Sequence, residues 1–247
     1  MSPSLLPMSG TASGLLRRVL SPLPEAVALW ALDLDDWSAV HPVSGLSVNE
    51  AERAARLRFD LDRQRYVAGR QAMRWLLAER LGRKPSELIL ANGPRGKPVL
   101  KGRDAWLEFN LSHSRAQALY GLSDGPPIGV DIEELRTLDD AEALARSHFS
   151  ATEFARWSSH SPADRPAAFL RCWTRKEACL KALGLGLAVE PHSFSAGTDA
   201  APARVTIEHE GRSSAVDVWS LQLVEPNRVC ALARTVTRTT RPAPTQR

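Results

Sequence analysis

The sequence has few of the features that mark secreted, membrane-spanning or disulfide-bonded proteins. Its 247 residues contain three cysteines, Cys172, Cys179 and Cys230, an odd number without the paired spacing of a metal site. We therefore expect reduced thiols in a cytoplasmic protein rather than a disulfide framework. The sequence contains no continuous apolar run of the kind found in secretory signals or membrane spans, so we expect no membrane partner.

The sequence also lacks a strong excess of charge of one sign. It has 32 lysines and arginines against 28 acidic residues, a formal net charge of +4, and 43% hydrophobic residues. Because the acids are interspersed among the basic residues, a solvated, arginine-rich surface is the first interpretation, and a phosphate-bearing or acidic partner is the second. Small anions and acidic proteins fit this balance as well as DNA does.

A weak internal repeat organises the chain. Each half has an apolar-acidic stretch, "ALDLDD" or "GVDIEE", then an S-x-x-E capping box at Ser47 or Ser150, and a helical stretch that closes at Gly82 or Gly184. Both halves then return to strands. We expect an α+β fold of two pseudo-twofold-related halves, each a small antiparallel sheet packed on a long helix, with the active site in the cleft between them. The expected boundaries are a disordered extension over 1–25, an N-terminal half over 26–124, a C-terminal half over 125–236 and a flexible tail over 237–247.

The stretch "FLRCWTRKEACLKALG" combines a helical apolar stripe with charges in unexpected positions. Lys176 falls inside the apolar arc, and Glu177 and Lys181 lie at its edge, whereas Arg171 and Arg175 fall on the opposite, solvated side. A helix-stabilising pair of Glu177 and Lys181, with Lys176 reaching out of the core, is one explanation. A cleft that holds a phosphate is the other, and it accounts for all three charges.

Three further stretches carry polar groups with possible chemistry. In "IGVDIEE", the acids at 131 and 133 share one face of a strand and either bind a hard cation or face solvent. "GPRGKPVL" is a glycine-rich loop with two cations, suited to a phosphate or to a plain surface turn. "FNLSHS" ends a strand with His113, which binds phosphate, moves a proton or is structural. Ser112 beside it does not indicate a hydrolase, because no G-x-S-x-G elbow is present.

Taken in order, "GKP", "FNLSHS", "IGVDIEE" and "WTRKEACLKALGLGL" resemble the motifs of the Sfp-type 4'-phosphopantetheinyl transferases, in the branch with tryptophan and Lys-Glu-Ala. The resemblance implies an enzyme of the holo-[acyl-carrier-protein] synthase type. Such an enzyme transfers 4'-phosphopantetheine from coenzyme A to a serine of an apo acyl or peptidyl carrier protein, with Mg²⁺, and releases adenosine 3',5'-bisphosphate. The duplication within one chain indicates a monomer, and we expect neither nucleic acid nor a membrane among its partners.

The resemblance also implies roles for individual residues. The metal ligands would be Asp131, Glu133 and Glu177, with water replacing Glu133 in some members of the family. The catalytic residues would be Glu177, Lys181 and Asp131, with Glu177 taking the serine proton directly or through water. The coenzyme-binding residues would be Arg53, Arg65, Arg95, Gly96, Lys97, Asn110, Ser112, His113, Lys176 and Lys181. Glu50 stands where some bacterial relatives carry a second basic residue, so the grip on the 3'-phosphate would rest on Arg53 and His113.

The alternative hypothesis is a non-enzymatic basic module that binds nucleic acid or an acidic protein. The two hypotheses differ in one observation. The transferase adds a phosphopantetheine mass to an apo carrier in the presence of coenzyme A and Mg²⁺, whereas the basic module gives a salt-dependent shift of duplex DNA. The sequence leaves the identity of the carrier open among fatty-acid, polyketide and nonribosomal-peptide carriers.

Overall fold

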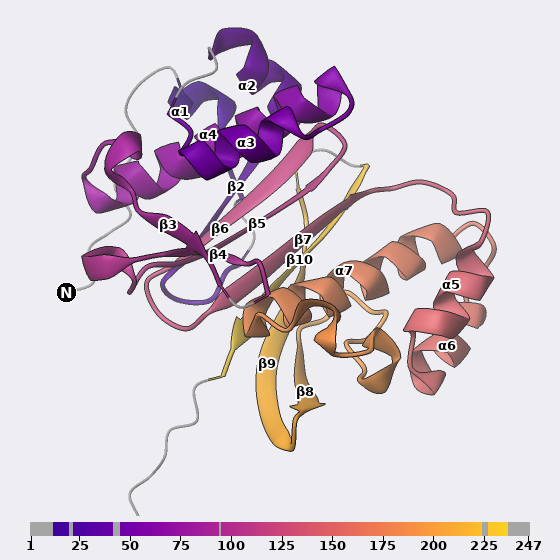
Figure 1. Ribbon diagram of the computed structural model, residues 1–247. Coiled ribbons are helices and arrows are strands. Elements are labelled where there is room, and N and C mark those ends of the chain that lie inside the picture. The colour runs from indigo at the N-terminus through magenta and orange to yellow at the C-terminus, as the bar shows by residue number, and fades with distance from the viewer. Residues whose placement is uncertain (1–11, 20–21, 42–44, 94, 224–226, 237–247) are drawn as a thin grey trace, which may run out of the picture.

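The computed structural model describes residues 12–19, 22–41, 45–93, 95–223 and 227–236 (Figure 1). Within them the chain forms two four-stranded antiparallel sheets, one from each half of the sequence, and each sheet packs against one long helix. The predicted α+β class and the organisation in two halves are confirmed. Residues 1–11, 20–21 and 237–247, which belong to the predicted extension and tail, lie outside the described residues.

The first half is built on the sheet order β1-β2-β6-β5. Its strands are β1 (Arg17–Arg18), β2 (Val27–Asp33), β5 (Glu108–Ser114) and β6 (Gln117–Ser123), and its long helix is α4 (Asp60–Leu81). On β2, one set of alternate residues packs toward α4 and the other set toward the second sheet, so both faces of the strand are buried. This sheet therefore forms an inner layer of the molecule.

Smaller elements complete the first half. They are α1 (Ala12–Leu15), α2 (Leu34–Val40), α3 (Val48–Ala55), η1 (Pro85–Glu87), β3 (Leu90–Asn92), β4 (Pro98–Leu100) and η2 (Gly102–Asp104). The expected disorder of the N-terminal extension is wrong for residues 12–19. There β1 pairs with β2, and Leu16 and Val19 are buried in the two cores that flank this sheet.

The second half has the sheet order β7-β10-β9-β8. Its strands are β7 (Ile128–Glu134), β8 (Ala203–His209), β9 (Arg212–Leu221) and β10 (Arg228–Thr235), and its long helix is α7 (Arg165–Leu183). Shorter helices accompany them: α5 (Ala141–His148), α6 (Ala151–Ser158), η3 (Gly186–Ala188) and η4 (Pro191–Ser193). Figure 1 shows α5 and α6 beside one end of α7.

The two sheets share an apolar core between them. It contains Leu29 of β2, Leu119 of β6, Val130 of β7 and Leu232 of β10, all of them buried. The order of layers is therefore α4, first sheet, second sheet, α7. Figure 1 shows α4 above the strands β5 and β6, and α7 on the other side of them. The facing edge strands β5 and β7 lie side by side across the junction between the halves.

Both predicted capping boxes are present. Ser47 begins α3 and Ser150 begins α6, and each accepts a hydrogen bond from the backbone of a glutamate three residues later, whose side chain bonds back. The two long helices end at Gly82 and Gly184, which have φ values of 63° and 65°. The repeat predicted from the sequence is thus a repeat of helix starts and helix ends.

Gly129 determines how closely α7 approaches β7. A Cβ atom at this position would lie 2.1 Å from the carbonyl oxygen of Ala178 and 2.3 Å from the nitrogen of Ala182, both in the backbone of α7. Only glycine permits this contact. The close approach places the Glu177–Lys181 turn of the helix directly beside the acids of β7.

Two expectations about the class of protein concern the whole fold. Cys172, Cys179 and Cys230 are all buried, and among the described residues none of them forms a disulfide. In the part of the chain that the structure describes, no helix combines the length and the apolar character needed to cross a membrane.

Candidate functional site

A pocket of about 310 Å³ lies in the first half, between α3, α4, the β3–β4 hairpin and β5. Its lining includes four of the predicted coenzyme-binding residues, namely Arg53, Arg65, Gly96 and His113. Arg53 is exposed and lies 5.9 Å from the centre of the Tyr66 ring. Arg65 is half-buried and forms a two-point ion pair with Asp35, at 2.9 and 2.7 Å. The pocket thus gathers cations around a space open to solvent.

The loop between β3 and β4 divides its residues between the pocket and the second half. Gly96, with φ of 83°, lines the pocket. Lys97 turns away and donates its Nζ proton to the carbonyl oxygen of Ile128 at 2.9 Å, and burial lowers its pKa. Arg95 contacts His209 at 3.1 Å and lies outside the pocket lining. Both side chains therefore contact the second half in this structure, and their predicted contact with the coenzyme stays a prediction.

β5 presents its alternate residues to two different sites. His113 faces α4 and lines the pocket, as Leu111 does. The neighbouring side chains face β7: Asn110 accepts a hydrogen bond from the backbone nitrogen of Val130 at 2.9 Å, and Ser112 donates one to Asp131 at 2.8 Å. Asn110, predicted to bind coenzyme, thus lies in the junction of the halves, because neighbours along a strand point to opposite faces.

His113 lies between the pocket and the acidic residues of the second half. Enclosure by neighbouring atoms lowers the pKa of its imidazole, and the cations of Lys181 and Arg65 lower it further, although part of the ring is open to solvent. The acids at 62 and 133 act in the opposite direction. A neutral ring therefore predominates near pH 7, and a bound anion would favour the protonated form.

Asp131, Ser112 and Lys181 form a compact polar cluster beside the pocket. Asp131 is 4% exposed, and its Oδ1 lies 2.6 Å from Nζ of Lys181, which also donates to Oγ of Ser112 at 3.0 Å. Burial raises the pKa of Asp131, whereas Lys181 and Ser112 oppose the rise. The second oxygen, Oδ2, is buried and has no hydrogen-bond partner among the described residues.

Glu133 and Glu177 extend this cluster. Glu133 accepts hydrogen bonds from Ser114 at 2.8 Å and from Arg136 at 3.3 Å. Burial raises the pKa of Glu177; Lys181 lowers it, and the neighbouring acids at 131 and 133 raise it further. Within the described ranges, no three His, Cys, Asp or Glu side chains lie close enough together to hold a metal ion as they stand.

Lys176 lies outside the site, and its predicted contact with a ligand is wrong. Its Nζ pairs with Glu153 at 2.7 Å and donates to the carbonyl oxygens of Pro191, at 2.7 Å, and Phe194. Both side chains of the pair are nearly inaccessible, at 1% for Lys176 and 2% for Glu153. The lysine in the apolar arc is therefore held by a buried carboxylate and two backbone carbonyls, and neither explanation considered for it from the sequence is right.

The opposite side of α7 also differs from the expectation. Arg175, predicted to be solvated, is 1% exposed and donates to the carbonyl oxygen of Ala196 at 2.6 Å and to Ser220 at 3.2 Å. Arg171 is half-buried and donates to the carbonyl oxygen of Thr198. The chain after α7 folds back over this face, so hydrogen bonds replace the expected solvent.

Two residues that line the pocket, Tyr66 and Arg70, were not predicted from the sequence. Arg70 of α4 pairs with Glu50, with Nε 2.7 Å from Oε1, and Tyr66 lies one turn before it on the same helix. Arg74, one turn further on, pairs with the other oxygen of Glu50 at 2.8 Å. The signal in the sequence is the i,i+4 spacing of Tyr66, Arg70 and Arg74.

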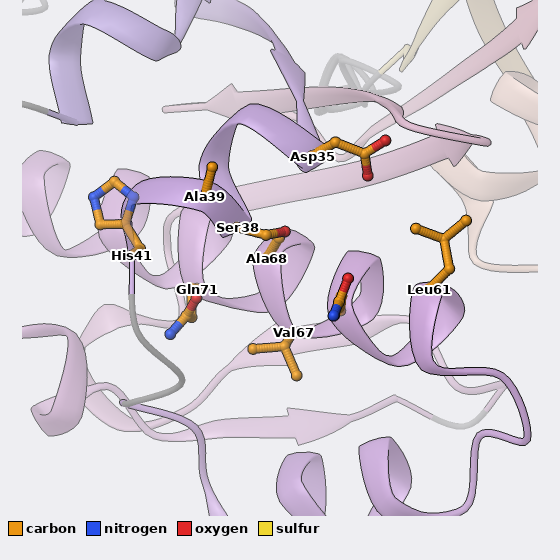
Figure 2. A pocket seen from close by; sticks show the side chains of 9 residues that line it. Asp35, Ser38, Ala39, His41, Leu61, Val67, Ala68 and Gln71 are labelled. Carbon is orange, nitrogen blue, oxygen red and sulfur yellow. The ribbon is translucent and has the colours of Figure 1, made fainter.

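A second cavity, of about 500 Å³, lies between α2 and α4 (Figure 2). Figure 2 shows its lining residues on the two helices, with Ser38 and Ala39 on α2 and Val67 and Gln71 on α4. None of the residues predicted for the site lines this cavity. Its described walls combine small apolar groups with polar ones and include no arginine or lysine.

Comparison with known families follows the division into halves. Residues 127–233 match the model of the 4'-phosphopantetheinyl transferase superfamily, and residues 28–119 match the model of the N-terminal part of a 4'-phosphopantetheinyl transferase. The chain is 35% identical to 4'-phosphopantetheinyl transferase HetI of Nostoc sp. over 218 residues, which cover 87% of this chain and 89% of that protein. The chain belongs to the 4'-phosphopantetheinyl transferase superfamily, as the resemblance noted in its motifs predicted.

Two other relatives carry similar names. The chain is 34% identical to 4'-phosphopantetheinyl transferase psf-1 of Bacillus pumilus, over 66% of this chain and 70% of the relative. It is 30% identical to 4'-phosphopantetheinyl transferase gsp of Aneurinibacillus migulanus, over 70% of this chain and 74% of the relative. These relatives therefore match across both halves rather than within one motif.

Proposed function

We propose that the protein transfers the 4'-phosphopantetheine group of coenzyme A to a serine hydroxyl of an apo acyl or peptidyl carrier protein, as a holo-[acyl-carrier-protein] synthase. Membership of the superfamily supports the class of reaction. The observation that carries the proposal is the path of β5. Its His113 lines the cation-rich pocket, while the preceding Ser112 donates to Asp131 of the acidic cluster. β5 thus links the proposed phosphate-binding pocket to Asp131, one of the proposed catalytic residues.

The pocket is the proposed place for the nucleotide end of coenzyme A. Arg53, Arg65 and Arg70 line it, and guanidinium groups bind phosphate oxygens through paired N–H donors. His113 would add a further donor on the side that leads to Asp131. With Glu50 committed to Arg70 and Arg74, a 3'-phosphate would meet mainly Arg53 and His113.

The acidic cluster supplies carboxylate oxygens, the type of donor that suits a magnesium ion. Carboxylate oxygens are the ligands that Mg²⁺ prefers, and the buried Oδ2 of Asp131 has no partner among the described residues. Asp131, Glu133 and Glu177 would hold the ion, and it would supply positive charge beside the pyrophosphate. Lys181, which already neutralises Asp131, supplies a second positive charge from the protein itself.

The proposed step is a displacement at phosphorus. The serine oxygen of the carrier forms a bond to the β-phosphorus of coenzyme A, and the bond from that phosphorus to the bridging oxygen breaks. The leaving group, adenosine 3',5'-bisphosphate, takes the electron pair. Glu177 accepts the serine proton, a role favoured by the burial and the neighbouring acids that raise its pKa. Lys181 stabilises the charge that develops on the phosphate oxygens.

The test is the mass of a panel of apo carrier proteins after incubation with the protein, coenzyme A and Mg²⁺. We expect at least one carrier to gain the mass of phosphopantetheine, and Asp131→Asn and Glu177→Gln to abolish the gain while the circular dichroism spectrum stays unchanged. A panel that remains unmodified, together with a salt-dependent shift of duplex DNA, would overturn the proposal in favour of the basic module.

We further propose a cytoplasmic monomer that serves an acidic carrier. Both sheets and their shared core come from one chain, which supports the monomer, and the three cysteines are buried without a disulfide between them, which agrees with a reducing compartment. The carrier that is modified to the greatest extent in the same panel would indicate the pathway. Sedimentation of the protein at several concentrations would test the monomer.

A further inference from the structure

The junction of the two halves is closed by side chains rather than by a continuous ladder. β5 and β7 are edge strands of different sheets. Three alternate residues of β5 reach across to β7: Asn110 to the backbone of Val130, Ser112 to Asp131, and Ser114 to Glu133. Because the strands present these residues at matched two-residue spacings, each of the two serines meets one carboxylate.

The two serines have the same pattern of hydrogen bonds. Ser112 accepts from Nζ of Lys181 at 3.0 Å and donates to Oδ1 of Asp131 at 2.8 Å. Ser114 accepts from the backbone nitrogen of Glu134 at 3.4 Å and donates to Oε2 of Glu133 at 2.8 Å. A hydroxyl has one proton, so accepting from an N–H group directs that proton to the carboxylate.

We infer that Ser114 is a positioning residue that holds the carboxylate of Glu133 in the orientation needed for the metal, as Ser112 holds that of Asp131. This inference rests on the proposed function, because it concerns the same acidic cluster. The hydroxyl contacts only one oxygen of Glu133 and leaves Oε1 for another partner. Hydrogen bonds from neighbouring residues to metal ligands set the orientation of those ligands, and losing one weakens metal binding by about 10–100-fold.

The experiment measures binding of Mn²⁺ by the loss of its free electron paramagnetic resonance signal, with and without coenzyme A. Ser114→Ala should weaken Mn²⁺ binding by about 10-fold, and Ser114→Thr, which keeps a hydroxyl, should restore it. Asn110→Ala is the matched control. It removes a bond between the same two strands without touching a carboxylate, so it should lower the midpoint of urea unfolding and leave Mn²⁺ binding in the absence of coenzyme A unchanged.

Each outcome separates this inference from the function on which it rests. If the wild-type protein binds no Mn²⁺, the proposed metal site itself fails. If the wild type binds Mn²⁺ and Ser114→Ala binds it equally well, the positioning role is overturned and the transferase proposal stands. The role is also overturned if Asn110→Ala weakens Mn²⁺ binding as much as Ser114→Ala does, because loosening of the junction would then explain both effects.

Discussion

The two halves use the same helix start and place its glutamate in different surroundings. In the second half, Glu153 pairs with Lys176 in a region closed to solvent. In the first half, Glu50 pairs with Arg70 and Arg74, and both Glu50 and Arg70 line an open pocket. The shared motif therefore serves the stability of both halves, and only in the first half does a cation paired with this glutamate line a pocket.

The pKa directions agree with this difference. Burial alone would raise the pKa of Glu50 and of Glu153, yet the net pKa of both is lowered. The bond to Ser47 and the charges of Arg70 and Arg74 lower it for Glu50, and Lys176 lowers it for Glu153. Both carboxylates are thus ionised in the folded protein, and each depends on its cations to be so.

The largest expected effect is on the closed pair of the second half. Lys176→Met leaves Glu153 buried without its cation, which should lower the free energy of unfolding by about 3–5 kcal/mol. Urea unfolding measures this change, and Lys101→Met, at an exposed position, is the control. If the Lys176→Met protein were as stable as the wild type but had lost affinity for coenzyme A, Lys176 would be a coenzyme-binding residue after all.

The open pair of the first half should respond in its binding. Arg70→Met removes a charged donor from the pocket and should weaken coenzyme A binding by roughly 10-fold or more, since a bond to a charged group contributes about 1.5–3 kcal/mol. Isothermal titration calorimetry measures the affinity. Arg74→Met is the paired variant, because Arg74 is 3% exposed and does not line the pocket.

We expect Arg74→Met to lower the midpoint of urea unfolding more than Arg70→Met does, and to change the affinity less. Equal losses of affinity in the two variants would show that the pocket depends on the ion-pair cluster as a whole rather than on Arg70. The difference in exposure between the ion pairs of Glu50 and Glu153 would then not explain which half binds the coenzyme.

The smallest expected effect is on the dependence of stability on pH. Because the pKa of Glu153 is lowered in the folded state, its contribution to stability is complete above the ordinary value of 4.5 and is lost as pH falls through the lowered pKa. The difference in free energy of unfolding between wild type and Glu153→Gln should therefore shrink between pH 5 and pH 3. A difference that stays constant over this pH range for Glu153→Gln would contradict the assignment.

Local patterns in the sequence predicted the skeleton of the fold. The capping boxes at Ser47 and Ser150 and the left-handed glycines at 82 and 184 are specified within a few residues, so they could be recognised without tertiary information. The alternation along β5 is equally local. It places His113 and Ser112 on opposite faces of the strand, whereas the family resemblance implies that both bind the coenzyme.

The partners of the charged residues on α7 could not be predicted in the same way. Helical periodicity gives the direction of Lys176 and Arg175 but not what covers each direction. Their partners are Glu153, 23 residues earlier than Lys176, and the backbone at Ala196, 21 residues later than Arg175. Periodicity therefore identified Lys176 as anomalous and placed Arg175 on the solvated side, and only tertiary packing shows that both side chains contact the protein.

The apolar layer between the two sheets has a consequence for the expression of either half as a separate fragment. Each half taken alone would expose the inner face of its sheet, including Leu29 and Leu119 on one fragment and Val130 and Leu232 on the other. Such faces are sites of aggregation when nothing covers them. Residues 124–127 connect two structural repeats, but fragments divided there need to be expressed together, because each is the folding partner of the other.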